Sequence, residues 1–97
     1  SLLVSKLDVD RRSDGRLAAL LRLTQTRSQP CKAVVRFLRD VEAAILIDHP
    51  GDDTINQTLP EANHASRLET SGDKISLSMA GHAVVDLLVV FDHPDSE

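Results

Sequence analysis

Apolar and polar positions alternate most clearly in the last third of the chain, residues 74–91. Ile75, Leu77 and Met79 alternate with serine and alanine, which is typical of a half-buried strand. The following segment, residues 84–91, is apolar at nearly every position, so we expect it to lie inside a sheet or beneath an interface. The short Gly-His turn between the two segments predicts a β-hairpin.

Two amphipathic helices are predicted upstream, within residues 14–42. Leu17, Leu20 and Leu21 fall at the spacing of one helical face. Pro30 suits the first turn of a second helix, because its missing N–H would have no partner there. The apolar stripe of this second helix comprises Cys31, Val34, Val35, Leu38 and Val41. The cysteine is therefore expected to be a small core residue.

Shorter segments complete the prediction. Residues 2–9 alternate as a first strand, residues 43–48 indicate a short buried strand, and residues 49–63 form a polar loop. A strand over residues 65–70 competes with a short helix from Leu59 to about Leu68. The strand is favoured because the Ser-Gly-Asp that follows it is a strong turn signal.

These elements together predict an α+β fold. A strand is followed by two amphipathic helices and a further strand, and the chain ends in the three-stranded meander of an antiparallel sheet. The helices are expected to pack on one face of this sheet. With 97 residues, 41% of them hydrophobic, the chain fits one domain, residues 1–97, with one core.

The longest wholly apolar runs, residues 43–47 and 87–91, are far shorter than the roughly 20 residues that a membrane helix needs. We therefore expect no association with a membrane. The first residues lack the basic start and apolar middle of a signal peptide, and a cytoplasmic location is expected. One cysteine allows neither an intrachain disulfide nor a thiolate zinc site.

Charge is divided unevenly along the chain. Residues 1–40 contain nine basic residues against four acidic ones, whereas residues 41–97 contain two basic residues against eleven acidic ones. Such a division indicates either two halves that attract each other within one domain or a basic face for an acidic partner. The first interpretation is favoured.

A nucleic-acid-binding regulator is the alternative function. The two basic helices predicted within residues 14–42 loosely match a helix-turn-helix, with the C-terminal hairpin as a wing. The candidate contacts are Arg12, Arg16, Arg22, Lys32, Arg36 and Arg39. The net charge of −4 opposes general attraction to phosphate, and two phenylalanines are the only aromatic residues, which argues against a base-stacking surface.

The tripeptide Asp-His-Pro occurs twice, each time after a predicted buried strand. The first copy supplies Asp48 and His49, and the second supplies Asp92 and His93. Aspartate and histidine together can bind a metal or form an oriented base. The two pairs meet if their strands run parallel and lie at opposite ends if the strands run antiparallel. A metal-dependent enzyme that uses these residues is the third function considered. It ranks below the other two because no recognisable catalytic motif supports it. We expect no cofactor.

The leading expectation is a small binding or regulatory domain that acts through protein–protein interaction rather than catalysis. A strand that is apolar on both faces, in a sheet that helices cover on one side, leaves apolar surface for a partner. A second copy of the chain is the expected partner, with Val84, Leu88 and Val90 in the homodimer interface. Another protein is expected to bind as well.

Overall fold

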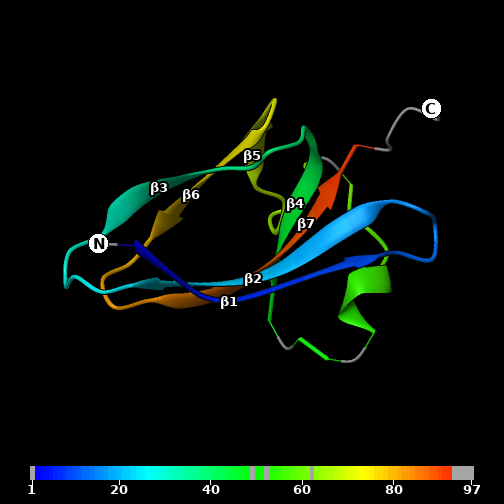
Figure 1. Cartoon of the computed structure of the whole chain (residues 1–97). Helices are drawn as coiled ribbons and strands as arrows, with labels where there is room; N and C mark the ends of the chain where they lie inside the picture. Colours follow the sequence, from blue (N-terminus) through cyan, green and yellow to red (C-terminus); the bar gives the residue numbers. More distant parts are fainter. Residues whose placement is uncertain (1, 49, 52, 62, 93–97) are drawn as a thin grey trace.

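The computed structural model describes residues 2–48, 50–51, 53–61 and 63–92, and in it the chain forms two antiparallel sheets (Figure 1). The elements are β1 (Leu2–Arg11), β2 (Leu17–Gln25), β3 (Cys31–Arg36), β4 (Val41–Ile47), the 3₁₀ helix η1 (Thr54–Asn56), β5 (Glu69–Ser71), β6 (Lys74–Met79) and β7 (Val84–Phe91). Sheet A has the strand order β1-β2-β7-β4, and sheet B has the order β3-β6-β5. The predicted α+β class is therefore wrong: among the described residues, the regular structure is β except for the single turn η1.

Both helices predicted within residues 14–42 are strands, β2 and β3. Leucine and alanine side chains of β2 are buried on both faces of sheet A, so apolar residues three and four apart fit a doubly buried strand as well as a helix. In β3, Ala33 and Val35 point inward while Lys32 and Val34 are exposed, which is a period of two. Tertiary packing overrides local helix propensity here. Within the described ranges, no helix has the length and apolar character needed to cross a membrane.

The predicted C-terminal meander is also wrong, because β6 and β7 pair with different strands. β5 and β6 form the expected hairpin, in which Gly72 adopts a positive φ of 59°. β6 passes into β7 through a corner at residues 80–83, a β-turn in which the N–H of Ala83 donates to the carbonyl of Ala80 at 3.2 Å, and β7 then joins the other sheet. Since β3 pairs with β6 and β2 pairs with β7, the chain crosses from one sheet to the other at two neighbouring turns, residues 26–30 and residues 80–83, where the N–H of His82 donates to the carbonyl of Arg27. Gly81 is needed at this corner, because a Cβ there would overlap the backbone of Ser28.

Three other predicted strands, over residues 2–9, 43–48 and 84–91, are confirmed as β1, β4 and β7. β7 lies in the interior of sheet A between β2 and β4, and all its residues from Leu87 to Phe91 are buried. This position agrees with the expectation for a strand that is apolar on both faces.

The principal core lies between the two sheets. Phe37 and Phe91 close one end of it with their rings edge to face, at a centroid separation of 5.4 Å and an interplanar angle of 74°. Besides Phe91, the buried side chains of this core include Leu21, Leu23, Ile75, Leu77, Met79, Leu87 and Val89. Burying an aliphatic side chain of this size contributes about 1.5–3 kcal/mol relative to leaving it exposed.

A second, smaller core lies on the other face of sheet A, beneath the segment that contains η1. Ile55 and Leu59 of this segment pack against a set of buried side chains from β2, β4 and β7. That set comprises Ala18, Ile45, Ile47, Leu88 and Val90. Sheet A is therefore covered by sheet B on one face and by an irregular segment on the other, instead of by the predicted helices.

Candidate interaction surface

The two Asp-His pairs are not brought together as a joint site. β4 and β7 run antiparallel, and Asp48 follows β4 while Asp92 follows β7, so the two carboxylates lie at opposite ends of this strand pair. His49 and His93 lie outside the described residues. In the part of the chain that the structure describes, no group of three or more His, Cys, Asp or Glu side chains is placed to hold a metal ion.

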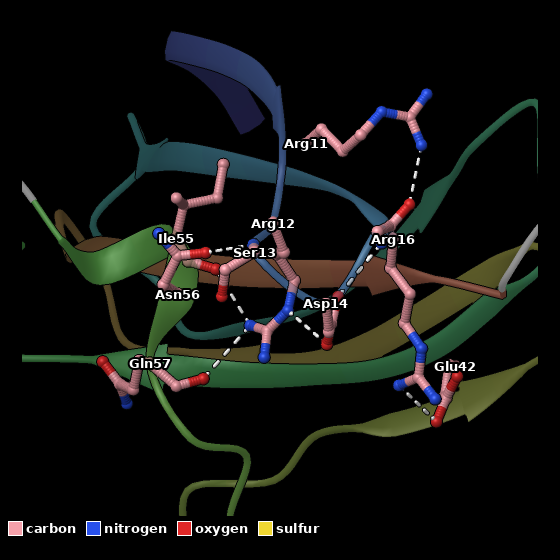
Figure 2. A network of polar contacts seen from close by, with 10 residues as sticks. Arg11, Arg12, Ser13, Asp14, Arg16, Glu42, Ile55, Asn56 and Gln57 are labelled. Carbon is pink, nitrogen blue, oxygen red and sulfur yellow. Dashed lines mark hydrogen bonds and ion pairs between the residues drawn. The ribbon is translucent and has the colours of Figure 1, made fainter.

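Arg12, one of the predicted nucleic-acid contacts, is buried in a polar network at the end of β1 (Figure 2). Its Nη1 donates to the backbone carbonyls of Ile55 at 2.9 Å and Gln57 at 3.1 Å. The backbone N–H of Ser13 donates to Asn56 Oδ1 at 2.6 Å. These three bonds attach the η1 segment to the turn between β1 and β2, so the guanidinium of Arg12 has a structural role.

The Asp14 carboxylate completes this network. Its Oδ1 accepts the backbone N–H of Arg16 at 3.0 Å, and its Oδ2 accepts Nε–H of Arg12 at 3.1 Å. The hydrogen bond from the Arg16 backbone and then the Arg12 guanidinium hold the pKa of Asp14 below its ordinary value, against an opposing effect of desolvation. Both donors stabilise the charged carboxylate, and Asp14 in turn orients Arg12 toward the η1 segment.

Two more of the predicted contacts form ion pairs between the basic and acidic halves of the chain. Arg16 Nη1 lies 2.8 Å from Glu42 Oε2. Arg22 and Asp86 lie directly opposite on β2 and β7, and Nε of the arginine donates to Oδ1 of the aspartate at 2.9 Å. The hydrogen bond with Asp86, and then its charge, raise the pKa of Arg22. Some basic residues of the first 40 positions therefore pair with acidic residues of the rest of the same chain.

The remaining predicted contacts, Lys32, Arg36 and Arg39, are exposed. Lys32 and Arg36 lie on the outer face of β3, and Arg39 lies in the turn before β4. Arg36 is directly opposite Lys74 of β6, so two like charges are neighbours on this face. Nucleic-acid binding by these three residues stays a prediction, without the helix pair on which it was based.

Two of the three predicted interface residues are covered by the chain itself. Leu88 and Val90 are fully buried in the second core, beneath Ile55 and Leu59. Val84, at the start of β7, is 56% exposed. Of this set, only Val84 presents its side chain to solvent.

A different apolar surface lies along β1, at one edge of sheet A (Figure 1). Every residue of this strand is exposed. Four apolar side chains of β1 lie on the face of sheet A that, at β2 and β7, forms the principal core. They are Leu2, Val4, Leu7 and Val9, with exposed fractions of 36%, 49%, 55% and 59%. We call these four residues the β1 apolar row. Leu7 and Val9 lie directly opposite the buried Leu21 and Ala19 of β2, so the row continues the core into solvent.

One edge of β1 pairs with β2, and in the described residues no strand pairs with its other edge. The pairing with β2 contains a bulge at Ser5, whose hydroxyl donates to the carbonyl of Arg22 at 3.3 Å. Backbone N–H and C=O groups along the outer edge are therefore available to another strand. The sequence pattern predicted β1 as a strand, but it carried no signal that β1 would lie at an edge.

These features define a two-sheet antiparallel β domain with one open, apolar edge strand. The chain matches no protein-family model, no curated protein and no solved structure. The function is therefore argued from the surfaces of the molecule itself.

Proposed function

We propose that the chain is a binding domain that acts through protein–protein interaction, and that β1 takes up an extended segment of the partner as an added strand. The observation that carries the proposal is the combination, on one strand, of an unpaired backbone edge and the β1 apolar row. Main-chain hydrogen bonds supply affinity in strand addition, and alternate side chains supply specificity. β1 offers both kinds of contact.

Edge strands of monomeric proteins are normally protected by shortness, proline, lysine or a covering segment. β1 is ten residues long and contains no proline, and its lysine points to the face opposite the apolar row. The bulge at Ser5 leaves the residues after it in regular pairing, and the charged Lys6, Asp8 and Asp10 leave the face with the apolar row free of their side chains. The edge is therefore suited to accept a strand.

Other exposed apolar side chains of the described residues do not form a comparable surface. Leu3 lies on the face of β1 opposite the apolar row, Val34 on β3, Leu38 in the turn after β3, Leu46 on β4 and Val84 on β7. Single exposed apolar residues are normal on protein surfaces, whereas a contiguous apolar row marks an interaction site.

The test is a selection of peptide ligands from a phage-displayed library of random peptides of the length of β1. Enriched peptides are expected to alternate apolar and polar residues, because an added strand presents every second side chain to the apolar row. Val9→Lys places a charge in this row and should weaken peptide binding at least about tenfold, a loss of about 1.4 kcal/mol.

Val34→Lys is the matched control. It is the same substitution at a strand residue of nearly equal exposure, 57% against 59%, in the other sheet. Peptide binding should survive it. A library that yields no binders, or equal binding by the two variants, contradicts the assignment of β1 as the binding edge.

A further inference from the structure

We infer that the strand added at β1 is β1 of a second copy of this chain, running antiparallel with Leu7 opposite Leu7. The inference rests on the proposed function of β1 and names its partner. In this arrangement the same residues of both copies meet across a twofold axis, as in most homodimers. Two four-stranded sheets become one continuous sheet.

The outer face of β1 carries opposite charges on either side of Leu7. Lys6 and Asp8 project from the face of sheet A opposite the principal core. Their own contact is long, at 4.0 Å, and their side chains are 62% and 63% exposed, so this ion pair contributes little within one copy. With Leu7 opposite Leu7, Lys6 of each copy faces Asp8 of the other, which gives two opposite-charge pairs across the join.

The same charges disfavour β1–β1 pairings in which the twofold axis is shifted along the strand. Moving the twofold axis by one residue shifts the partner strand by two residues, which keeps apolar row beside apolar row. Centring on Asp8 pairs Lys6 with Asp10 twice but also brings two aspartates together, and centring on Lys6 brings two lysines together. Centring on Val9 pairs Asp8 with Asp10 twice. Like charges directly opposite are destabilising, so the register centred on Leu7 is favoured over these three.

The inner face of β1 is compatible with the same register. Ser5 is the extra residue of the bulge, so Val4 returns to the apolar row. With the bulge kept, Val4 of each copy lies across from Val9 of the other, on either side of the Leu7 pair. The apolar row is therefore paired in the register that the charges on the other face select.

The test measures the mass of the full chain in solution by light scattering and sedimentation, from micromolar to near-millimolar concentration. The unaltered chain should become a dimer as concentration rises. Lys6→Asp places acid opposite acid at both contacts, and Asp8→Lys places lysine opposite lysine, so each variant should raise the dimer Kd at least about tenfold. Mixing the two variants in equal amounts should restore dimers, because each contact then pairs opposite charges.

Two controls distinguish an effect on the β1–β1 dimer interface from an effect on the stability of the fold. Lys32→Asp changes the charge of an exposed strand residue in sheet B and should leave the dimer Kd unchanged. At concentrations where the unaltered chain is monomeric, thermal unfolding of Lys6→Asp and Asp8→Lys should match that of the unaltered chain, because both side chains are exposed. Hydrogen exchange of the unaltered chain should slow at β1 amides as dimer forms and stay constant at β4 amides.

Each result bears on the inference. A dimer that is insensitive to both charge reversals, or that the mixture fails to restore, overturns this register. A chain that stays monomeric at every concentration overturns self-pairing. If such a monomer still binds selected peptides through β1, the proposed function stands and the partner is another protein, whereas loss of both activities removes the function as well.

Discussion

The two edge strands of sheet A, β1 and β4, differ in what covers them. Along β4 the chain itself returns: the N–H of Leu46 donates to the carbonyl of Ser66 at 2.9 Å, and the N–H of Leu68 donates to the carbonyl of Ala44 at 2.8 Å. Along β1 no described segment returns in this way. Both strands are rich in aliphatic residues, so composition does not explain the difference. It arises from the path of the chain, which closes one edge internally and leaves the other open to a second molecule.

Side chains of β4, the covered edge strand, should contribute more to the free energy of unfolding than side chains of β1. Ile45 of β4 is 1% exposed in the second core, whereas Leu7 of β1 is 55% exposed. Ile45→Ala removes buried methyl groups and leaves a cavity, so we expect a loss of about 2–5 kcal/mol in the free energy of unfolding. Leu7→Ala should cost less than about 1 kcal/mol, because its side chain is half in water already. Urea unfolding at low protein concentration measures both.

Self-association gives this pair of variants a second readout. At high concentration, Leu7→Ala should weaken the dimer, because Leu7 lies at the centre of the proposed join. Ile45→Ala should leave the dimer Kd of the folded fraction unchanged. Equal losses of unfolding free energy for the two variants would show that β1 is as well covered as β4, contrary to the comparison.

The cover over the second core should be the next most sensitive feature. Arg12→Met keeps an apolar stem but removes the donor to the carbonyls of Ile55 and Gln57, which then lack this partner. Leaving such groups unsatisfied costs about 1–3 kcal/mol. Arg11→Met is the matched control, since Arg11 is exposed and its side chain donates only to the Gly15 carbonyl among the bonds described. This substitution should change stability by no more than about 0.5 kcal/mol.

Chemical denaturation of the two variants, with hydrogen exchange at residues 54–57, checks this expectation. Exchange there should become faster in Arg12→Met than in Arg11→Met, because the η1 segment loses its attachment to the turn after β1. The β1 edge should keep its binding behaviour in both variants. Equal exchange in the two would mean that Ile55 and Leu59 hold the segment by apolar packing alone.

The strands that could be predicted from sequence are those with an unambiguous local pattern. β6 shows strict alternation, and β7 shows an apolar run too short for most helices. β2 could not be separated from a helix, because leucine and alanine on both faces satisfy either period. In β3 the burial alternates but the sequence does not, because Val34 is apolar like Ala33 and Val35 yet is 57% exposed; it was assigned to an apolar helical stripe. Pairing partners join residues far apart in the chain, so local pattern did not predict that β6 and β7 separate.

The binding edge was less predictable than the strands. The alternation of residues 2–9 placed Leu3, Leu7 and Val9 on one side of a strand, but the bulge at Ser5 puts Leu3 on the other face. Whether the side with Leu7 and Val9 is covered depends on strand order, which places β1 outermost in sheet A. Leu88 and Val90 were expected in an interface because a strand apolar on both faces needs cover on both. The η1 segment supplies this cover, and its apolar contacts, Ile55 and Leu59, are isolated in a polar stretch of sequence.

The smallest expected effect is a pH dependence of stability that arises from Asp14, which orients Arg12 toward the η1 segment over the second core. The pKa of Asp14 is lowered in the folded chain, so its carboxylate stabilises the fold fully above the ordinary value of about 3.9, and this contribution is lost as pH falls below that value. Asp14→Asn should therefore be less stable than the unaltered chain at neutral pH, and the difference should shrink as the solution is acidified past that value. Unfolding midpoints across this range measure it, with Asp40→Asn, an exposed carboxylate in the turn before β4, as the matched control. A constant difference at every pH would show that Asp14 acts through its shape and neutral hydrogen bonding, and that the charge of the carboxylate does not help Arg12 to hold the η1 segment.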